Sequence, residues 1–190
     1  MLVRYLNLSK TVGYVPICNV THNFSPLIAA LCVIIEFNSG SLMKLYFKDV
    51  SNKERHQTFE VFKKYMKPVV EKAIGWDEDF QANGFRNCLP PECFFWIEVA
   101  DKRVGLVCFK TLDSAIHIHL LIIFENHQGH GYGSLVTEHF KSRAFNNNTS
   151  LRFSCFKNNE PALRLYRKLK FKIVSEDKHF FNFSACNENT

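Results

Sequence analysis

A glycine-rich turn between a predicted strand and a predicted helix is the stretch of this chain best suited to chemistry. It reads Gln128-Gly129-His130-Gly131-Tyr132-Gly133. The apolar run 115–124 before it is typical of a buried strand, and the apolar residues after it recur at helical spacing. Such a turn presents successive backbone N–H groups and the positive end of a helix dipole, and its glycines allow a ligand to approach the backbone closely. The turn therefore predicts a phosphate-binding site.

Two common phosphate loops do not fit this turn. No lysine follows Gly133, as GxxxxGK[ST] requires, and the glycines are spaced GxGxG late in the chain, whereas a dinucleotide loop is GxGxxG after an early strand. The six residues do fit Q/R-x-x-G-x-G/A. They resemble the acetyl-CoA pyrophosphate loop of the GNAT superfamily of N-acetyltransferases. Taken alone, the motif leaves open a tight turn before an ordinary helix.

A second segment, 159–171, supports the same resemblance. It reads NEPALRLYRKLKF and is similar to the GNAT signature N-x-x-A-x-x-L-Y-x-x-x-G-F. One marked position differs, because Lys170 replaces the glycine, so the turn after this helix must place a lysine at positive φ. The two motifs stand in the family's order with a strand between them, and the resemblance covers about 43–185.

The resemblance implies a GNAT fold of the mixed α/β class. We expect a mixed sheet of six or seven strands, flanked by about four helices and splayed open beside the glycine-loop helix. Acetyl-CoA would lie in the opening as cosubstrate, without a metal, its pantetheine arm pairing with the strand and its pyrophosphate on the loop amides. The cofactor-binding residues that the resemblance implies are Leu121, Ile122, Ile123, Gln128, Gly129, His130, Gly131, Tyr132, Gly133, Ser134 and Asn159.

The implied reaction is direct attack of a primary amine on the thioester in a ternary complex. The tyrosine that matches Tyr166 lies beside the thioester sulfur in many relatives, and a phenol of pKa about 10 is a reasonable proton donor to a thiolate. Core packing is the alternative for Tyr166. His117 and His119 share one strand face and are candidate general bases, unless they only line the cleft or pack. Glu98 is the reserve candidate.

The amine acceptor is predicted to bind at the connection between the first two helices, which forms the lip of the acceptor site in this superfamily. Acidic groups beside an indole would attract a cationic amine. The residues predicted to bind the acceptor are Tyr65, Trp76, Asp77, Glu78 and Glu98. A solvated helix cap at Asp77 with Trp76 in the core is the alternative. A small molecule, a peptide N-terminus and a lysine side chain all remain open as acceptors.

Hydrophobic periodicity and turn residues place the other elements. We predict a strand at 42–50, a helix at 53–74 with a kink or break at Pro68, and a short helix at 77–87 capped by Asp77. A hairpin of 94–100 and 104–112 follows. After the glycine-loop helix come a strand at 151–156, a helix at 161–169 and a hairpin of 171–175 and 179–185.

The composition predicts one globular domain, because the 190 residues are 46% hydrophobic and include 19 Phe. The net charge of +6 comes without a basic run, which argues against a nucleic-acid partner. The seven cysteines form no CxxC pair, which favours reduced thiols in a cytoplasmic protein over structural zinc.

The first 42 residues have no counterpart in the family layout. Their apolar run 26–37 is shorter than the ~20 residues that span a bilayer, so no membrane partner is predicted. It is either an extra strand or helix packed on the domain, or part of an extension 1–42 that precedes a GNAT domain at 43–190.

Two functions follow from the resemblance. The first is an acetyl-CoA-dependent N-acetyltransferase of small-molecule or peptide amines. The second is a non-catalytic CoA-binding sensor or interaction module, which Lys170 and the lack of a glutamate at a base position of some relatives favour. A toxin that acetylates aminoacyl-tRNA fits poorly with the weak basic character. A homodimer is left open.

Overall fold

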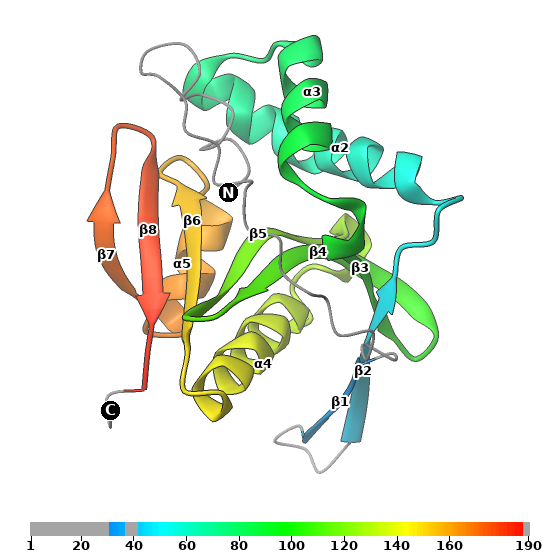
Figure 1. Ribbon diagram of the computed structural model, residues 1–190, viewed down its shortest axis with the longest axis vertical. Helices are drawn as coiled ribbons and strands as arrows, with labels where there is room; N and C mark the ends of the chain where they lie inside the picture. The colour runs from blue at the N-terminus through cyan, green and yellow to red at the C-terminus, as the bar shows by residue number, and fades with distance from the viewer. Residues whose placement is uncertain (1–30, 37–41, 188–190) are drawn as a thin grey trace.

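An eight-stranded mixed sheet organises the chain in a computed structural model, which describes residues 31–36 and 42–187. The strand order is β1-β2-β3-β4-β5-β6-β8-β7 (Figure 1). Only β5 and β6 pair in parallel, and every other pair of neighbours is antiparallel. The mixed α/β class predicted from the sequence is confirmed, with one strand more than the expected six or seven.

The elements fall close to their predicted positions. The strands are β1 (Leu31–Glu36), β2 (Leu42–Asp49), β3 (Phe94–Val99), β4 (Lys102–Leu112), β5 (Ala115–Ile123), β6 (Ser150–Phe156), β7 (Lys172–Glu176) and β8 (Phe180–Ala185). The helices are α2 (Arg55–Ile74), α3 (Glu78–Cys88), α4 (Tyr132–Asn146) and α5 (Glu160–Lys168), with short 3₁₀ turns η2 (Pro91–Cys93) and η3 (Glu125–His127).

Two hydrophobic cores form because the sheet carries helices on both faces (Figure 1). Helices α4 and α5 cover one face, where Phe140 and Leu163 pack against sheet residues such as Ile116. Helices α2 and α3 cover the other face, where Phe62 and Phe85 pack on β3, β4 and β5. Central strands therefore bury side chains on both sides, which explains why β5 is an almost continuous apolar run.

Pro68 does not break α2, contrary to one of the two predicted outcomes. It lies inside a single helix from Arg55 to Ile74. Proline removes the hydrogen bond to the carbonyl of Lys64, but Lys64 and Pro68 are both exposed, so water can solvate that carbonyl. The buried side of the helix, which includes Phe62 and Val70, continues without interruption.

The N-terminal segment is described only in part, since 1–30 and 37–41 lie outside the described residues. The described part of the apolar run is β1, which pairs antiparallel with β2 at one edge of the sheet. The division into an extension 1–42 and a domain 43–190 stays a prediction. No described helix has the length and apolar character to cross a bilayer.

Lys170 has φ of +58°, as the substitution of a lysine for the signature glycine predicted. The amide of Lys170 donates to the carbonyl of Arg167, and the amide of Phe171 donates to that of Tyr166, each at 3.0 Å. These two bonds form a Schellman motif that ends α5, in which the position of Lys170 normally favours glycine. The turn thus connects the helix that carries Tyr166 to β7 at a conformational cost.

We expect Lys170→Gly to stabilise the protein by about 1 kcal/mol, because glycine adopts positive φ without the clash of a Cβ. Arg164→Gly is the control, since Arg164 is an exposed residue inside the same helix and its replacement should destabilise by about 1 kcal/mol. Urea unfolding of both variants measures the difference. An unstabilised Lys170→Gly would show that the turn carries no strain.

Candidate active site

Strands β5 and β6 pair only where they begin. Their three pairs run from Ala115 with Ser150 to His117 with Arg152. Beyond that point, 118–123 of β5 stay paired with β4, and 153–156 of β6 stay paired with β8, but not with each other (Figure 1). The two facing edges therefore hold backbone N–H and C=O groups without strand partners, which an extended ligand could bond.

A β-bulge in β5 lies where the two strands begin to diverge. Cys108 of β4 pairs with Leu120 and Phe109 pairs with Ile118, so His119 is the extra residue. An extra residue bends a strand and increases its twist, in keeping with the divergence of β5 from β6. The sequence pattern gave no sign of this bulge.

Gly105 holds the other edge of β5 close to β4. A Cβ at this position would lie 2.3 Å from the carbonyl oxygen of Ile122, so no side chain can be accommodated without moving β5. Sequence reasoning missed this residue. A lone glycine inside the strand pattern 104–112 was the available signal.

The glycine loop begins where β5 ends. The Gln128 side-chain amide donates to the carbonyl of Ile123 at 2.9 Å, which ties the loop to the strand. Gly129 and Gly131 have φ of +80° and +83°, and a Cβ on either would meet nothing within 4 Å. Two of the glycines that the sequence predicted to bind pyrophosphate thus border open space just before α4, whereas a Cβ on Gly133 would lie 3.3 Å from Leu165.

The backbone amides of the loop lack protein acceptors. Those of Tyr132, Gly133 and Ser134 begin α4 and have no intrahelical carbonyl to bond. Those of Gly129, His130 and Gly131 donate to no carbonyl of the described residues. Buried or ordered donors of this kind require water or an anionic ligand.

His130 lies on the loop as a side-chain support. Its Nδ1 is 2.9 Å from the carbonyl oxygen of Gln128, and its ring stacks on that of Tyr132 with centroids 6.0 Å apart. Both contacts hold the conformation in which the loop amides stay open.

His117 and His119 contact each other, as the shared strand face predicted. Nδ1 of His117 lies 3.3 Å from Nε2 of His119, and the ring centroids are 4.4 Å apart. Burial, together with the neighbouring His117, lowers the pKa of His119 to about 2. His119 is thus neutral at physiological pH and a weak proton acceptor, whereas His117 is only half-buried.

Tyr166 packs in the core that α4 and α5 cover, with only 6% of its surface exposed. Its ring centroid lies 4.4 Å from that of Phe153 and 5.3 Å from that of Phe183. Burial, and secondarily the neighbouring Cys155, raises the pKa of its phenol. Phe153 and Cys155 both belong to the part of β6 that diverges from β5, so the Tyr166 side chain packs against that part of the strand.

Asn159 caps α5, since its side-chain oxygen accepts from the amide of Ala162 at 3.4 Å. Its neighbour Asn158 donates from Nδ2 to the carbonyl of Val69 at 2.9 Å. That bond ties α2 to the loop after β6, across the opening from β5. Sequence reasoning missed Asn158, because the family signature marks only Asn159.

The predicted acceptor residues Trp76, Asp77 and Glu78 lie together between α2 and α3, but their polar groups are engaged locally. Glu78 accepts from Lys63 at 2.6 Å and from the Trp76 indole at 2.8 Å, and these bonds lower the pKa of its carboxyl. Asp77 caps α3 by accepting from the amide of Phe80 at 2.9 Å, as the sequence predicted.

Tyr65 links α2 to the end of β5. Its hydroxyl accepts from the amide of Glu125 at 3.1 Å, and its ring stacks on Phe124 with centroids 5.9 Å apart. The side chain therefore fixes α2 over the strand that leads into the glycine loop.

Glu98, the reserve base and predicted acceptor residue, is ion-paired on β3. Its carboxylate lies 3.5 Å from Arg103 Nε and 3.8 Å from Lys48 Nζ. Arg103 also forms an ion pair with Glu54, the residue before α2, and its guanidinium lies over the Trp96 ring. Glu98 is thus part of a local ion-pair cluster with Lys48, Arg103 and Glu54.

Cys93 and Cys155 are buried in the two cores of the described part of the chain. Burial raises the pKa of Cys93 and of Cys155 to about 11, so both stay protonated and unreactive at neutral pH. No group of three or more metal-ligating side chains occurs among residues 42–187.

The profile of the acetyltransferase (GNAT) family matches residues 50–171. The chain belongs to the GNAT acetyltransferase family. The match includes both motifs, the diverging strands and α2 and α3. No curated protein matches the chain.

Solved structures of GNAT proteins share the fold. Ard1 from Thermoplasma volcanium is 20% identical, with a TM-score of 0.52 over 75% of this chain and 97% of that one. Arabidopsis thaliana Naa50, in complex with the bisubstrate analogue CoA-Ac-MVNAL, is 17% identical, with a TM-score of 0.53 over 75% and 99%. Arabidopsis NAA60, in complex with acetyl-CoA, is 12% identical, with a TM-score of 0.51 over 75% and 99%.

We expect Gly131→Leu to weaken acetyl-CoA binding by at least about 100-fold, since its side chain would fill the space in front of the loop amides and remove several charge-assisted hydrogen bonds. Gly75→Leu is the matched control, because Gly75 has the same positive φ of +82° and equally open space at the end of α2. Calorimetry measures affinity and thermal unfolding measures strain. Equal affinity in the two variants would contradict a pyrophosphate site at this loop.

Proposed function

We propose that this GNAT protein is an N-acetyltransferase that moves the acetyl group of acetyl-CoA to a primary amine by direct attack in a ternary complex. The observation that carries the proposal is the opening between β5 and β6, which leads directly into a glycine loop with unpartnered amides. The family, and structural neighbours crystallised with acetyl-CoA or a CoA analogue, support it.

The residues around the opening fit acetyl-CoA. The edge of β5 at Leu121, Ile122 and Ile123 would pair with the amides of the pantetheine arm, and the amides of 129–134 would bind the pyrophosphate. Gln128 would hold the loop against the end of β5, and Asn159 would lie across the opening at the start of α5. Acetyl-CoA supplies the activated acetyl group.

An amine that is partly neutral at pH 7.5 suits this site best. Glu78 and Glu98 are ion-paired and His119 is a weak base, so the proposed transfer favours an amine that does not depend on these residues as bases. A peptide α-amine, of pKa about 7.7–8.0, is then roughly one-third neutral, whereas only about a thousandth of a lysine amine is. The proposed acceptor is therefore an α-amine, carried by a peptide or a small molecule.

Three groups would serve the transfer. A backbone N–H of the diverging part of β5 would stabilise the negative charge on the carbonyl oxygen as the C–N bond forms. His117 would take the proton that the amine loses, directly or through water, with His119 fixing its ring. Tyr166 would give its proton to the sulfur as the C–S bond breaks. Burial raises the pKa of the phenol, which keeps it protonated at neutral pH but also makes it a weaker acid, so its donation to the sulfur would begin as a hydrogen bond to the forming thiolate.

The acceptor class is tested with two peptides, using the sequence MVNAL from the analogue bound to Naa50. One has a free α-amine, and the other has an acetylated α-amine and a C-terminal lysine. We expect release of free CoA at pH 7.5 with the first peptide and at least about 100-fold slower release with the second, because so little lysine amine is neutral. Binding of acetyl-CoA with no release for either peptide, or for small α-amines, would favour the sensor alternative.

Tyr166→Phe should lower turnover by about 10²–10⁴-fold, because the ring and its packing remain while the proton donor is lost. Affinity for acetyl-CoA and the midpoint of thermal unfolding are the controls, and both should change little. A variant with full turnover would assign Tyr166 to the core alone.

For His117→Ala we expect a loss of turnover that diminishes as pH rises from 6 to 10, since the amine then needs no base. His119→Ala is the matched control on the same strand. Because His119 acts through packing and ring position, its loss should not depend on pH in this way. Parallel pH profiles for the two variants would remove the base role from His117.

A further inference from the structure

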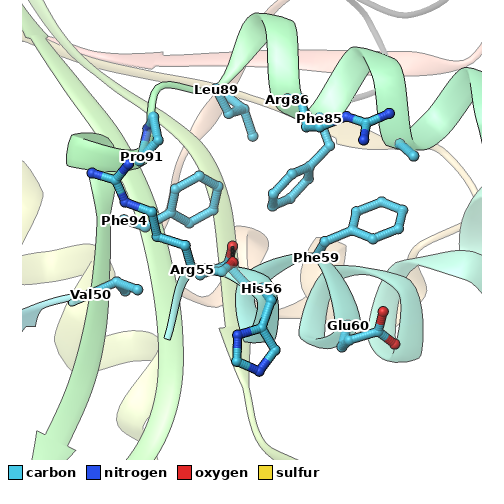
Figure 2. Close-up of a pocket in the computed structure, with 12 residues that line it drawn as sticks. Val50, Arg55, His56, Phe59, Glu60, Phe85, Arg86, Leu89, Pro91 and Phe94 are labelled. Atoms are coloured by element: carbon cyan, nitrogen blue, oxygen red, sulfur yellow. Dashed lines mark hydrogen bonds between the residues drawn. The ribbon is translucent and has the colours of Figure 1, made fainter. Parts of the chain in front are cut away.

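A cavity of about 480 Å³ lies between α2 and α3 (Figure 2). None of its lining residues belongs to β5, the glycine loop, β6 or α5. They come from the first turns of α2, from α3 and the residue after it, from the residue after β2, and from the first residues of η2 and β3: Val50, Arg55, His56, Thr58, Phe59, Glu60, Ala82, Phe85, Arg86, Leu89, Pro91 and Phe94.

The walls of the cavity are aromatic and aliphatic. The rings of Phe59, Phe85 and Phe94 face the hollow in Figure 2. Phe85 lies 5.3 Å from Phe59 and 5.2 Å from Phe94 between centroids, so the three form one continuous surface. Leu89 and Val50 extend this surface and are themselves buried. A flat apolar ligand would displace water from the surface of these rings, which is favourable because apolar surface is removed from water.

The volume is that of a ligand site rather than of a packing defect. Protein interiors leave few voids larger than a water molecule, which takes about 30 Å³ of liquid volume. Pockets for small ligands have about 300–1,000 Å³. The cavity between α2 and α3 falls within that range.

The rim of the cavity is cationic. Arg55 extends along one side towards Pro91, and Glu60 lies on the opposite side (Figure 2). Among the described residues Arg55 has no carboxylate within ion-pair distance, and Arg86 bonds only the neutral side chain of Asn83, at 2.8 Å. Two guanidinium groups against a single rim carboxylate favour an anionic ligand.

We propose that this cavity binds a small carboxylate with a flat apolar body, of the arylalkanoate class. The body packs against Phe59, Phe85 and Phe94, and the carboxylate bonds the guanidinium of Arg55 on the side away from Glu60. Since the cavity shares no residue with the loop or with β5 and β6, the ligand binds together with acetyl-CoA rather than in its place.

The experiment titrates 3-phenylpropanoate into the full chain, with and without saturating acetyl-CoA, and follows backbone amides by ¹H–¹⁵N NMR. We expect shifts confined to 50–60 and 82–94, and the same affinity in both titrations. The neutral analogue 3-phenylpropanol should bind about 10-fold more weakly, the contribution of one charge-assisted hydrogen bond.

Two variants test the walls and the rim separately. Ala82→Leu fills the cavity and should weaken binding at least about 10-fold, whereas Asn87→Leu, exposed on the same helix and outside the lining, should not. Arg55→Gln should bind about 10-fold more weakly, whereas Arg164→Gln, an exposed arginine on α5, should match the parent. Arg55 is exposed, so this pair stays informative if Ala82→Leu does not fold.

Three results would overturn the proposal. The first is the absence of shifts at millimolar 3-phenylpropanoate, and the second is a shift pattern centred on 118–134. The third is equal affinity for the acid and the alcohol, which would leave the cavity apolar but without a carboxylate site. None of these readouts depends on acetyl transfer.

Discussion

The early end of pairing between β5 and β6 is the constraint on which the rest of this structure depends. Three pairs hold the strands together, and beyond His117 and Arg152 each strand pairs only on its outer edge. The backbone N–H and C=O groups on the inner edges have no strand partner. They must therefore form hydrogen bonds with water or with an extended ligand. The bulge at His119 and the close approach at Gly105 both lie where β5 pairs with β4 on its other edge.

The helices on the two faces position different parts of the proposed active site. Helix α5 packs Tyr166 against β6, and α4 begins at the loop amides. Helix α2 is fixed over the opening from both sides, by Tyr65 to the amide of Glu125 and by Asn158 to the carbonyl of Val69. A displacement of α2 would therefore strain its contacts both with the end of β5 and with the loop after β6.

The acidic side chains that the sequence offered to an amine are paired within the protein. Glu78 is held by Lys63, and Glu98 lies between Lys48 and Arg103. A strongly cationic acceptor would have to compete with these internal partners, whereas a monoamine that is partly neutral would not. These internal ion pairs are the physical reason for proposing an α-amine as the acceptor.

Local signals in the sequence were sufficient for much of the fold. The period of the apolar residues located the strands and helices, Asp77 was recognisable as a helix cap, and the lysine at position 170 implied a strained turn. Each depends on residues close together in the chain. Both motifs also lie within one strand-to-helix or loop-to-helix unit.

Long-range partners could not be predicted in the same way. The acidic residues at 77 and 78 suggested a free anionic surface for the acceptor. Lys63, which lies 15 residues earlier in α2, forms an ion pair with Glu78 instead. The depressed pKa of His119 depends on burial, which spacing does not reveal. The cavity between α2 and α3 depends on how the two helices and η2 pack, and no motif marks it.

Amide hydrogen exchange with and without acetyl-CoA tests the central claim most directly. The account predicts slower exchange in 118–123 and 129–134, where unpartnered N–H groups would bond the ligand, and unchanged exchange in 82–94 around the separate cavity. Unchanged exchange in both 118–123 and 129–134 at saturating acetyl-CoA would contradict binding in the opening between β5 and β6.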